Sequence, residues 1–214
     1  MYLPRHFTED RVPTLHEAIR SAGLATLVTV GDSGPEANHV PVLLDAGPGP
    51  LGTLVGHVAR ANPVWRTARA GVPALAIFLG PDAYVSPSWY ASKERTGEVV
   101  PTWNYVAVHA SGPIRFFEDP TWLRALVTRL TERHEAGREQ PWSVSDAPEN
   151  YVDGMLRAIV GFELRIERLE GKWKASQNRS EEDRAGVVEG LSGERRPGAV
   201  AMAAIVEAGG SREG

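Results

Sequence analysis

The sequence predicts a mainly β protein of the α+β kind, most simply a small closed β-barrel with peripheral helices. Segments with strand periodicity recur seven times in its 214 residues, and hairpin turns or short helices join them. That order suits a barrel better than a parallel, doubly wound sheet. A chain of this length can bury a large core in one domain. We therefore expect a barrel domain over residues 1–179 and a helical tail over residues 180–214.

Helix and strand signals alternate along the chain. Capping residues mark the helix starts at Asp10, at Asn62 with Pro63, and at Asp119 with Pro120. The strands that we expect are residues 24–30, 36–45, 51–58, 72–79, 83–86, 105–117 with a bend near Gly112 and Pro113, and 161–169. The helices that we expect are residues 11–22, 62–70 and 119–130, a short helix containing Met155 and Leu156, and an Ala-rich segment over 197–208, before a disordered end at 209–214.

Composition narrows the expected compartment and partners. The chain has 23 Lys and Arg against 27 Asp and Glu, a net charge of −4. An acidic chain gains little from counterion release, which argues against direct DNA binding without a local basic patch. The absence of cysteine excludes disulfides and fits a reducing compartment. The N-terminus does not resemble a signal peptide and no apolar run reaches membrane-spanning length, so we expect a cytoplasmic protein with no membrane partner.

The sequence lacks the motifs of several common enzyme classes. Its six histidines show neither H-x-x-x-H nor H-E-x-x-H spacing, so we expect no bound metal. Its serines lack the G-x-S-x-G elbow, and its glycines lack both G-x-G-x-x-G and the P-loop pattern. We therefore assign no catalytic residue from motifs.

The stretch from residue 80 to residue 112 is the most informative part of the chain. It reads GPDAYVSPSWYASKERTGEVVPTWNYVAVHASG and places clusters of aromatic and polar residues between two segments that read as strands. A pure core strand has no use for so many hydrogen-bond donors. Aromatic faces with a few placed polar groups are typical of a pocket for a planar heteroaromatic cofactor.

Seven blocks of distinctive residues punctuate the chain. In order they are MYLPRHF, HVP, GHVARANP, VSPSWY, VPTWNYVAVHASG, GFE and GKWKASQNR. This series closely resembles the PaiB-like FMN-binding negative transcriptional regulators, over residues 1 to about 190. The resemblance implies a split β-barrel, similar to the pyridoxamine phosphate oxidases, that binds FMN at a homodimer interface.

The GHVARANP block is expected to hold the FMN phosphate. A strand runs there into a helix whose free N–H groups and positive dipole end attract an anion, and Arg60 adds a bidentate donor. The alternative is an ordinary helix cap with a surface arginine, and the resemblance favours the phosphate site. It also implies that the preceding strand lies along the isoalloxazine edge. The FMN contacts expected here are His39, Val40, Pro41, His57, Arg60 and Asn62.

The SPSWY block is expected to line the flavin ring. The hydroxyls of Ser86 and Ser88 could reach ring oxygens and nitrogens, with the aromatic ring of Tyr90 beside them. The alternative for Trp89 and Tyr90 is a dimer interface, where aromatic residues are enriched. Both interpretations hold together if the cofactor lies at that interface.

The VPTWNY block offers a hydroxyl, an amide and two aromatic rings. On a strand, Thr102 and Asn104 share one face while Trp103 and Tyr105 share the other. We expect the face with Thr102 and Asn104 to contact the flavin. We expect Trp103 and Tyr105 to pack against the core or a partner subunit.

The GKWKASQNR block is expected to follow the final strand and to carry positive charge. Such a cluster could serve a phosphate or the N1/O2 edge of the flavin, where positive charge stabilises the reduced anion. The alternative is a solvated strand end. The cofactor contacts that we expect from this block are Lys174, Gln177 and Arg179, within a cluster that includes Lys172, Ser176 and Asn178.

Three functions follow from these patterns and from the resemblance. The first is an FMN-binding homodimer that regulates transcription by sensing redox state or metabolites. The second is an FMN-dependent oxidoreductase of a small molecule. The third is a haem-binding split-barrel protein, for which His39, His57 and His109 are possible ligands.

Overall fold

The computed structural model describes residues 1–47 and 49–210, and these divide into two compact units. Unit 1 combines Met1–Leu15, Leu79–Val108 and the chain from Glu170 onward, and unit 2 combines His16–Phe78 with His109–Leu169. Both sides of the predicted boundary between residues 179 and 180 belong to unit 1, and a domain division there stays a prediction. Residues 211–214 of the predicted disordered end lie outside the described residues.

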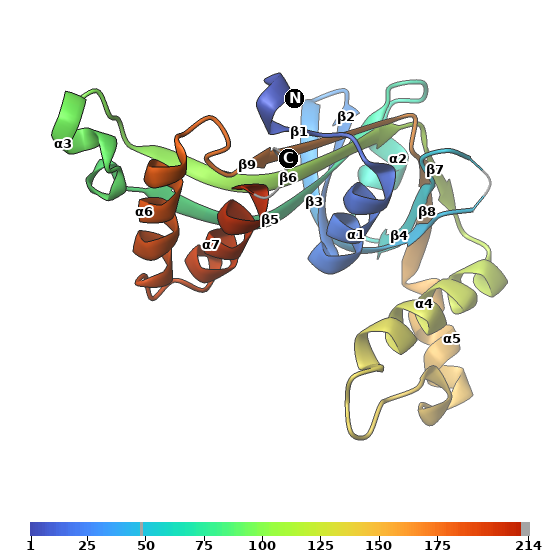
Figure 1. Cartoon of the computed structure of the whole chain (residues 1–214). Coiled ribbons are helices and arrows are strands. Elements are labelled where there is room, and N and C mark those ends of the chain that lie inside the picture. The colour runs from blue at the N-terminus through green and yellow to red at the C-terminus, as the bar shows by residue number, and fades with distance from the viewer. Residues whose placement is uncertain (48, 211–214) are drawn as a thin grey trace. The chain divides into compact units, whose positions relative to one another are not determined.

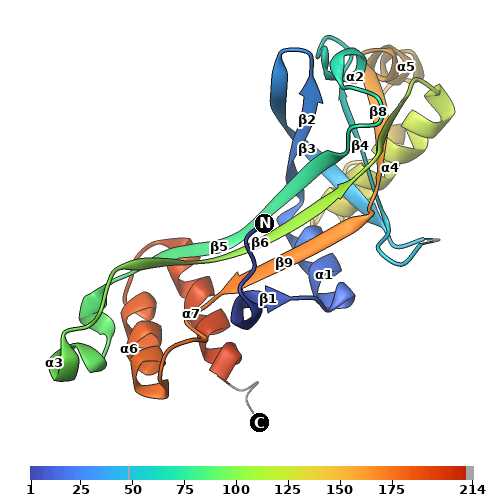
Figure 2. The same cartoon turned by 90° about the horizontal axis from the view of Figure 1, so that it is seen from above.

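The described part of the chain contains nine strands, in the sheet order β1-β9-β6-β5-β2-β3-β4-β8-β7 (Figures 1 and 2). Every pairing of known register is antiparallel, as short hairpin connections predict. The strand bounds are β1 Thr8–Glu9, β2 Leu24–Gly31, β3 Gly34–Asp45, β4 Thr53–Ala59, β5 Ala74–Val85, β6 Thr102–Gly112, β7 Ile114–Phe117, β8 Ile159–Arg165 and β9 Arg168–Lys174.

Helices accompany these strands in both units. Their bounds are α1 Val12–Ala22, α2 Val64–Thr67, α3 Ser92–Thr96, α4 Pro120–Glu135, α5 Glu149–Arg157, α6 Glu181–Ser192 and α7 Pro197–Gly210. Among the residues described, no helix combines the length and the apolar character needed to cross a membrane. Because α7 extends through Gly210, the prediction of disorder from residue 209 is wrong for its first two residues.

The predicted hairpin of unit 2 is confirmed as β2 and β3. Its register pairs Thr26 with His39, and the turn returns through Gly34 at φ 107°, a conformation that favours glycine. Alternate residues of β2, such as Ala25 and Leu27, are buried. The alternation of apolar residues along β2 therefore identifies the side chains on the buried face of the sheet.

Strand β5 joins two segments that the sequence predicts as separate strands. Gly80 and Pro81 suggest a break, yet the strand continues through them. A Cβ atom on Gly80 would lie 3.0 Å from Cβ of Val106, so glycine is the residue that allows this close approach to β6. The glycine marks tight strand packing here and not a strand end.

Two other predicted strands are each divided. The expected strand 105–117 breaks at Pro113, which lacks a backbone donor, into β6 and β7. The expected strand 161–169 ends earlier, and β9 follows it through Lys174. The prediction that Lys172 and Lys174 come after the final strand is therefore wrong, because both lie within β9.

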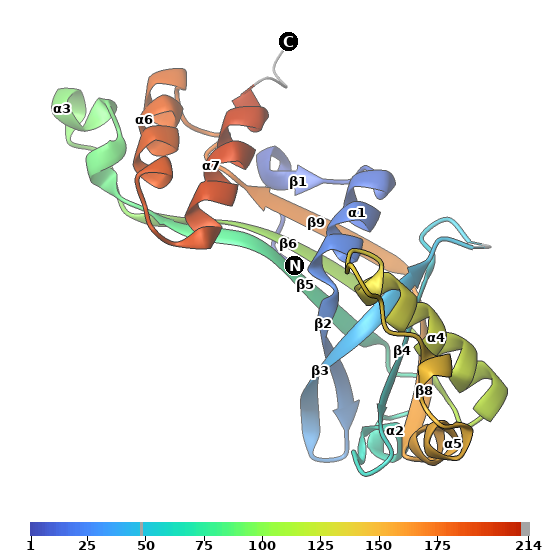
Figure 3. The same ribbon diagram turned by 90° about the horizontal axis from the view of Figure 1, so that it is seen from below.

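The core of unit 1 lies where α6 and α7 cover β5 and β6 (Figure 3). Two glycines of α6 allow the helix to lie directly on Trp89. A Cβ atom on Gly186 would lie 2.0 Å from the Trp89 carbonyl oxygen, and one on Gly190 would lie 2.2 Å from the indole ring. Trp89 thus packs inside unit 1, and the helical tail forms part of that unit's core.

In unit 2, helices α4 and α5 form a second apolar layer. Asp119 caps α4 as predicted, because its carboxylate accepts hydrogen bonds from the N–H groups of Thr121 and Trp122. Leu123 of α4 packs with Leu156 of α5 in one buried cluster. The helix predicted after Asn62 is shorter than expected, since α2 ends at Thr67.

Candidate functional site

The predicted cofactor residues separate into two sets, one in each unit. Unit 2 holds the set from β3, β4 and the turn after β4, which is His39, Val40, Pro41, His57, Arg60 and Asn62. Unit 1 holds the set from the SPSWY, VPTWNY and GKWKASQNR blocks, which is Ser86, Ser88, Tyr90, Thr102, Asn104, Lys174, Gln177 and Arg179.

A cluster of cations in unit 1 surrounds Lys174. The Lys174 ammonium donates hydrogen bonds to the Thr102 hydroxyl and to the carbonyl oxygen of Trp103. Burial lowers the pKa of Lys174, and the neighbouring charges of Lys172 and Arg179 lower it further. A desolvated ammonium repelled by two other cations favours an anion beside it.

The turn after β9 is held in a strained and well-bonded conformation. Ser176 has φ 61°, the single positive φ of a non-glycine residue in the described part of the chain. Its hydroxyl accepts a 2.9 Å hydrogen bond from the side-chain amide of Asn104, which is 1% exposed. The Gln177 side chain accepts from the N–H of Ala175 and donates to Trp173 O. Strain of this kind is concentrated at functional sites.

Tyr90 and Arg179 lie together beside this turn. The Arg179 guanidinium carbon lies 4.7 Å from the centroid of the Tyr90 ring. Tyr90 is 2% exposed, and its hydroxyl has no hydrogen-bond partner among the described residues. Burial raises the pKa of Tyr90, although the charge of Arg179 opposes that shift. An unpartnered buried hydroxyl beside a cation is suited to a polar ligand atom.

A buried carboxylate completes this part of unit 1, and sequence reasoning missed it. Asp183 accepts 2.8 Å hydrogen bonds from both the N–H and the hydroxyl of Ser92. Burial raises the pKa of Asp183, but these bonds and the charge of Arg179 outweigh burial and leave it lowered. The sequence signal that could have identified Asp183 is Ser180, a typical helix cap three residues before it. The Ser180 hydroxyl accepts a hydrogen bond from the N–H of Asp183 and so places Asp183 in the first turn of α6.

The remaining predicted residues of unit 1 have local roles. The Ser86 hydroxyl accepts from the N–H of Ser88 and caps a 3-10 turn, Pro87–Trp89. Trp103 is 48% exposed, so the part of our prediction that placed it in the core is wrong. Its ring meets Tyr84 edge to face at 6.1 Å. Flavin contacts from Ser86, Ser88 and Asn104 stay predictions.

In unit 2, the predicted phosphate residue already has several partners. The Arg60 guanidinium donates to Glu118 and to the carbonyl oxygens of Arg157 and Ile159. Asn62 caps α2 as expected, since its side-chain oxygen accepts from the N–H of Val64 at 3.0 Å. Because Glu118 already pairs with the guanidinium, Arg60 would have to exchange it for a phosphate, and that role stays a prediction.

His39, Val40 and Pro41 follow one another on β3, and His57 lies on β4. His39 shares a 3.1 Å hydrogen bond with the Thr26 hydroxyl, while Val40 is buried. Pro41 and His57 line a common cavity with residues of α4. Sequence reasoning missed the other side of this cavity, because α4 and Trp142 are distant from β3 and β4 in the chain.

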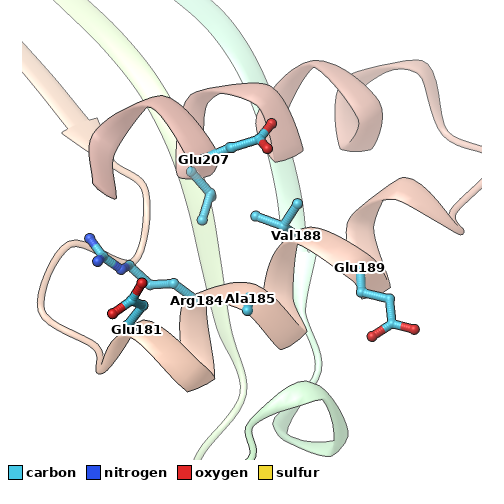
Figure 4. Close-up of a pocket in the computed structure, with 7 residues that line it drawn as sticks. Glu181, Arg184, Ala185, Val188, Glu189 and Glu207 are labelled. Atoms are coloured by element: carbon cyan, nitrogen blue, oxygen red, sulfur yellow. The ribbon is translucent and has the colours of Figure 1, made fainter. Parts of the chain in front are cut away.

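A groove between α6 and α7 in unit 1 does not fit an anionic cofactor (Figure 4). Its volume is about 460 Å³, and both helices contribute side chains to it. The carboxylates of Glu181, Glu189 and Glu207 outnumber the one guanidinium, that of Arg184. Three negative charges repel a phosphate, so this groove is not a candidate for FMN.

The cation cluster of unit 1 does fit FMN. Lys174 and Arg179 supply positive charge, and the unpartnered Tyr90 hydroxyl supplies a donor or acceptor. Such groups complement the phosphate or the electron-rich ring edge of a flavin. Among the described residues, no group of three His, Asp or Glu side chains is placed to hold a metal ion.

Comparison with known proteins agrees with this chemistry. Residues 1–168 match the family described as "Putative FMN-binding domain". The chain is 34% identical over 207 residues to protease synthase and sporulation protein PAI 2 of Bacillus subtilis. The aligned region covers 97% of each chain. Membership of the family is therefore shown for most of the chain.

Solved structures share the fold at low sequence identity. The FAD and heme binding protein from Mycobacterium smegmatis aligns with a TM-score of 0.57 at 19% identity, over 83% of this chain and 78% of that chain. The flavocytochrome Anf3 from Azotobacter vinelandii aligns with a TM-score of 0.59 at 14% identity, over 86% and 78%. The predicted split β-barrel fold is confirmed, and the chain belongs to the PaiB-like family of FMN-binding proteins, with FMN as its cofactor.

Proposed function

We propose that this protein is a cytoplasmic FMN-binding homodimer that acts in transcriptional regulation by sensing redox state or a metabolite through its flavin. The observation that carries the proposal is the relation to PAI 2, which extends over 97% of both chains and therefore includes the helices after the family domain. The relative's name connects it with protease synthesis and sporulation.

Within this proposal, the cation cluster of unit 1 serves the N1/O2 edge of the flavin. Lys174 is desolvated and repelled by Lys172 and Arg179, so an anion that approaches them is stabilised by all three charges. Reduction places negative charge on that edge. The cluster is therefore expected to stabilise reduced FMN more than oxidised FMN and to raise the midpoint potential.

Substitution Lys174→Met tests this role. We expect it to lower the midpoint potential of the bound flavin by about 30–60 mV, the equivalent of a charge-assisted hydrogen bond. The binding of FMN and of riboflavin should weaken by the same factor, because both flavins have the N1/O2 ring edge. The matched control is Lys93→Met, since Lys93 is an exposed lysine of the same unit.

Other results would overturn the assignment. An unchanged potential in Lys174→Met would remove the ring-edge role, and weakening of FMN alone would assign Lys174 to the phosphate. The visible spectrum of the purified protein tests the cofactor itself. Flavin bands support the proposal, whereas a Soret band would favour haem.

Regulation is proposed to be indirect, because Lys172 and Arg196 already have partners within the protein. The Lys172 ammonium donates to the Tyr2 carbonyl oxygen at 3.0 Å, and Arg196 lies 3.6 Å from the Asp82 carboxylate. With a net charge of −4, little positive charge is left for phosphates. We expect no sequence-specific binding to the protein's own upstream DNA in an anisotropy titration at near-physiological salt. Saturable nanomolar binding that resists unrelated DNA would contradict this.

A further inference from the structure

Two adjoining cavities in unit 2 share the side chain of His57. Their volumes are about 310 Å³ and 270 Å³, and β4, α4 and α5 contribute to their walls. Both cavities also share Val127, Thr131 and Trp142. Because all these residues belong to unit 2, the cavities are complete within one compact part of the chain.

The walls are mostly apolar and aromatic. Val152, Leu156 and Ile159 line the smaller cavity, and the larger one adds Leu130. Trp142 and Tyr151 supply the aromatic surface and are 49% and 58% exposed, so aromatic rings remain accessible from solvent. A concave apolar site with few polar groups is typical of small-molecule binding.

His57 is the polar group that the protein leaves unsatisfied in these cavities. Its Nδ1 atom is buried and has no hydrogen-bond partner among the described residues. The neighbouring Gly56 packs against the Phe162 ring, which lies 2.6 Å from where a Cβ atom would be. Burial lowers the pKa of His57, so the imidazole is neutral near pH 7. A buried polar atom without a partner is costly unless a ligand bonds to it.

We propose that these cavities bind a small uncharged aromatic alcohol whose hydroxyl hydrogen-bonds to Nδ1 of His57 and whose ring lies against Trp142. A hydroxyl both donates and accepts, so it suits either tautomer of a neutral imidazole. The described lining residues include neither Lys nor Arg, and Glu135 lines the larger cavity, so an anion such as FMN does not fit. This site goes beyond the flavin assignment in unit 1, and on this proposal His57 and Pro41 line a site for the alcohol instead of the FMN contacts predicted for them.

Phenol and toluene are matched probes for this site, because toluene has a methyl group of similar size in place of the hydroxyl. With the full-length, flavin-loaded protein we expect phenol to bind about threefold to tenfold more tightly than toluene by calorimetry. Phenol should also shift the imidazole nitrogen resonances of His57 in a histidine-labelled sample. Toluene should leave the Nδ1 resonance nearly unchanged.

Variants separate the hydroxyl contact from the cavity itself. His57→Leu should abolish the preference for phenol, while His6→Leu, which alters a histidine of unit 1, should retain it. Ala147→Phe fills the smaller cavity and should weaken both probes together, with His57 unaltered. Equal affinities of phenol and toluene for the unsubstituted protein, or no binding of phenol at millimolar concentration, would overturn the proposal.

Discussion

The side-chain amide of Asn104 donates a 2.9 Å hydrogen bond to the hydroxyl of Ser176, inside unit 1. The bond joins β6 to the turn after β9, and Ser176 is held there at φ 61°. Left-handed backbone costs a non-glycine residue about 1–2 kcal/mol. The hydrogen bond and the surrounding packing therefore offset local strain next to the cation cluster.

Two substitutions of Ser176 separate the bond from the strain. Ser176→Ala removes the acceptor, leaves the Asn104 amide unsatisfied and should destabilise the protein by about 1–3 kcal/mol. Ser176→Gly removes the same acceptor but relieves the backbone strain, so its loss should be smaller by about 1 kcal/mol. Urea unfolding of both variants measures the difference. A glycine variant less stable than the alanine variant would disprove this account.

Glycine substitutions in α6 test the packing of Trp89. Gly190→Ala places a methyl group against the indole ring and should destabilise the protein by about 1–3 kcal/mol through overpacking. Gly193→Ala is the matched control, because its nearest contact would be 3.6 Å away. Thermal unfolding compares the two. Equal stability of both variants would mean that α6 does not lie on Trp89 in solution.

Arg60 can bind the FMN phosphate, as predicted, only if the phosphate replaces Glu118 as the partner of its guanidinium. If phosphate replaces Glu118, Arg60→Ala should weaken FMN by about 1.5–3 kcal/mol and leave riboflavin unchanged. Glu118→Gln should strengthen FMN binding, because it removes the competing carboxylate. Fluorescence titration with both flavins measures these effects. Identical FMN affinities in all three proteins would leave Arg60 a purely structural link to Arg157 and Ile159.

His57 should make stability depend on pH below about 6.5, its ordinary pKa. Burial lowers the folded-state pKa, so in that window the unfolded chain binds more protons and stability falls as pH falls. His134, Glu135 and Tyr151 also face these cavities, so the comparison must be with His57→Leu. That variant should show a shallower decline in unfolding free energy between pH 6.5 and 5. An unaltered slope would show that His57 does not titrate as described.

The homodimer is predicted to form through exposed apolar residues of β5 and β6 in unit 1. Leu79 is 67% exposed on β5, and Tyr84 and Trp103 meet edge to face on β5 and β6. Trp103→Asp should dissociate the dimer, whereas Val200→Asp on α7 should not, and added salt should have little effect on assembly. Sedimentation velocity measures each case. A stable monomer that still binds flavin tightly would contradict the prediction.

Turn and cap residues in the sequence correctly predicted those elements whose formation depends on only a few neighbouring residues. The hairpin around Gly34 and the capped start of α4 at Asp119 are examples. The continuous course of β5 through Gly80 was not predictable, because it depends on close packing with Val106 of another strand. Likewise, His57 and Trp142 share cavities although 85 positions separate them in the sequence. Contacts between residues so far apart in the sequence produce no periodic pattern from which they could be predicted.

The chain order of the two units bears on how the protein is made. Every residue of unit 2 has been synthesised once the ribosome passes residue 169, whereas unit 1 still awaits the chain from Glu170 onward. Strand β1, which is synthesised before every other strand of the sheet described here, finds its partner in β9 through the pairing of Thr8 with Lys172. Domains generally fold in the order of their synthesis, so unit 2 should mature first during translation. The cation cluster then assembles only after Arg179 has been synthesised, and a nascent chain remains without it while unit 2 is already complete.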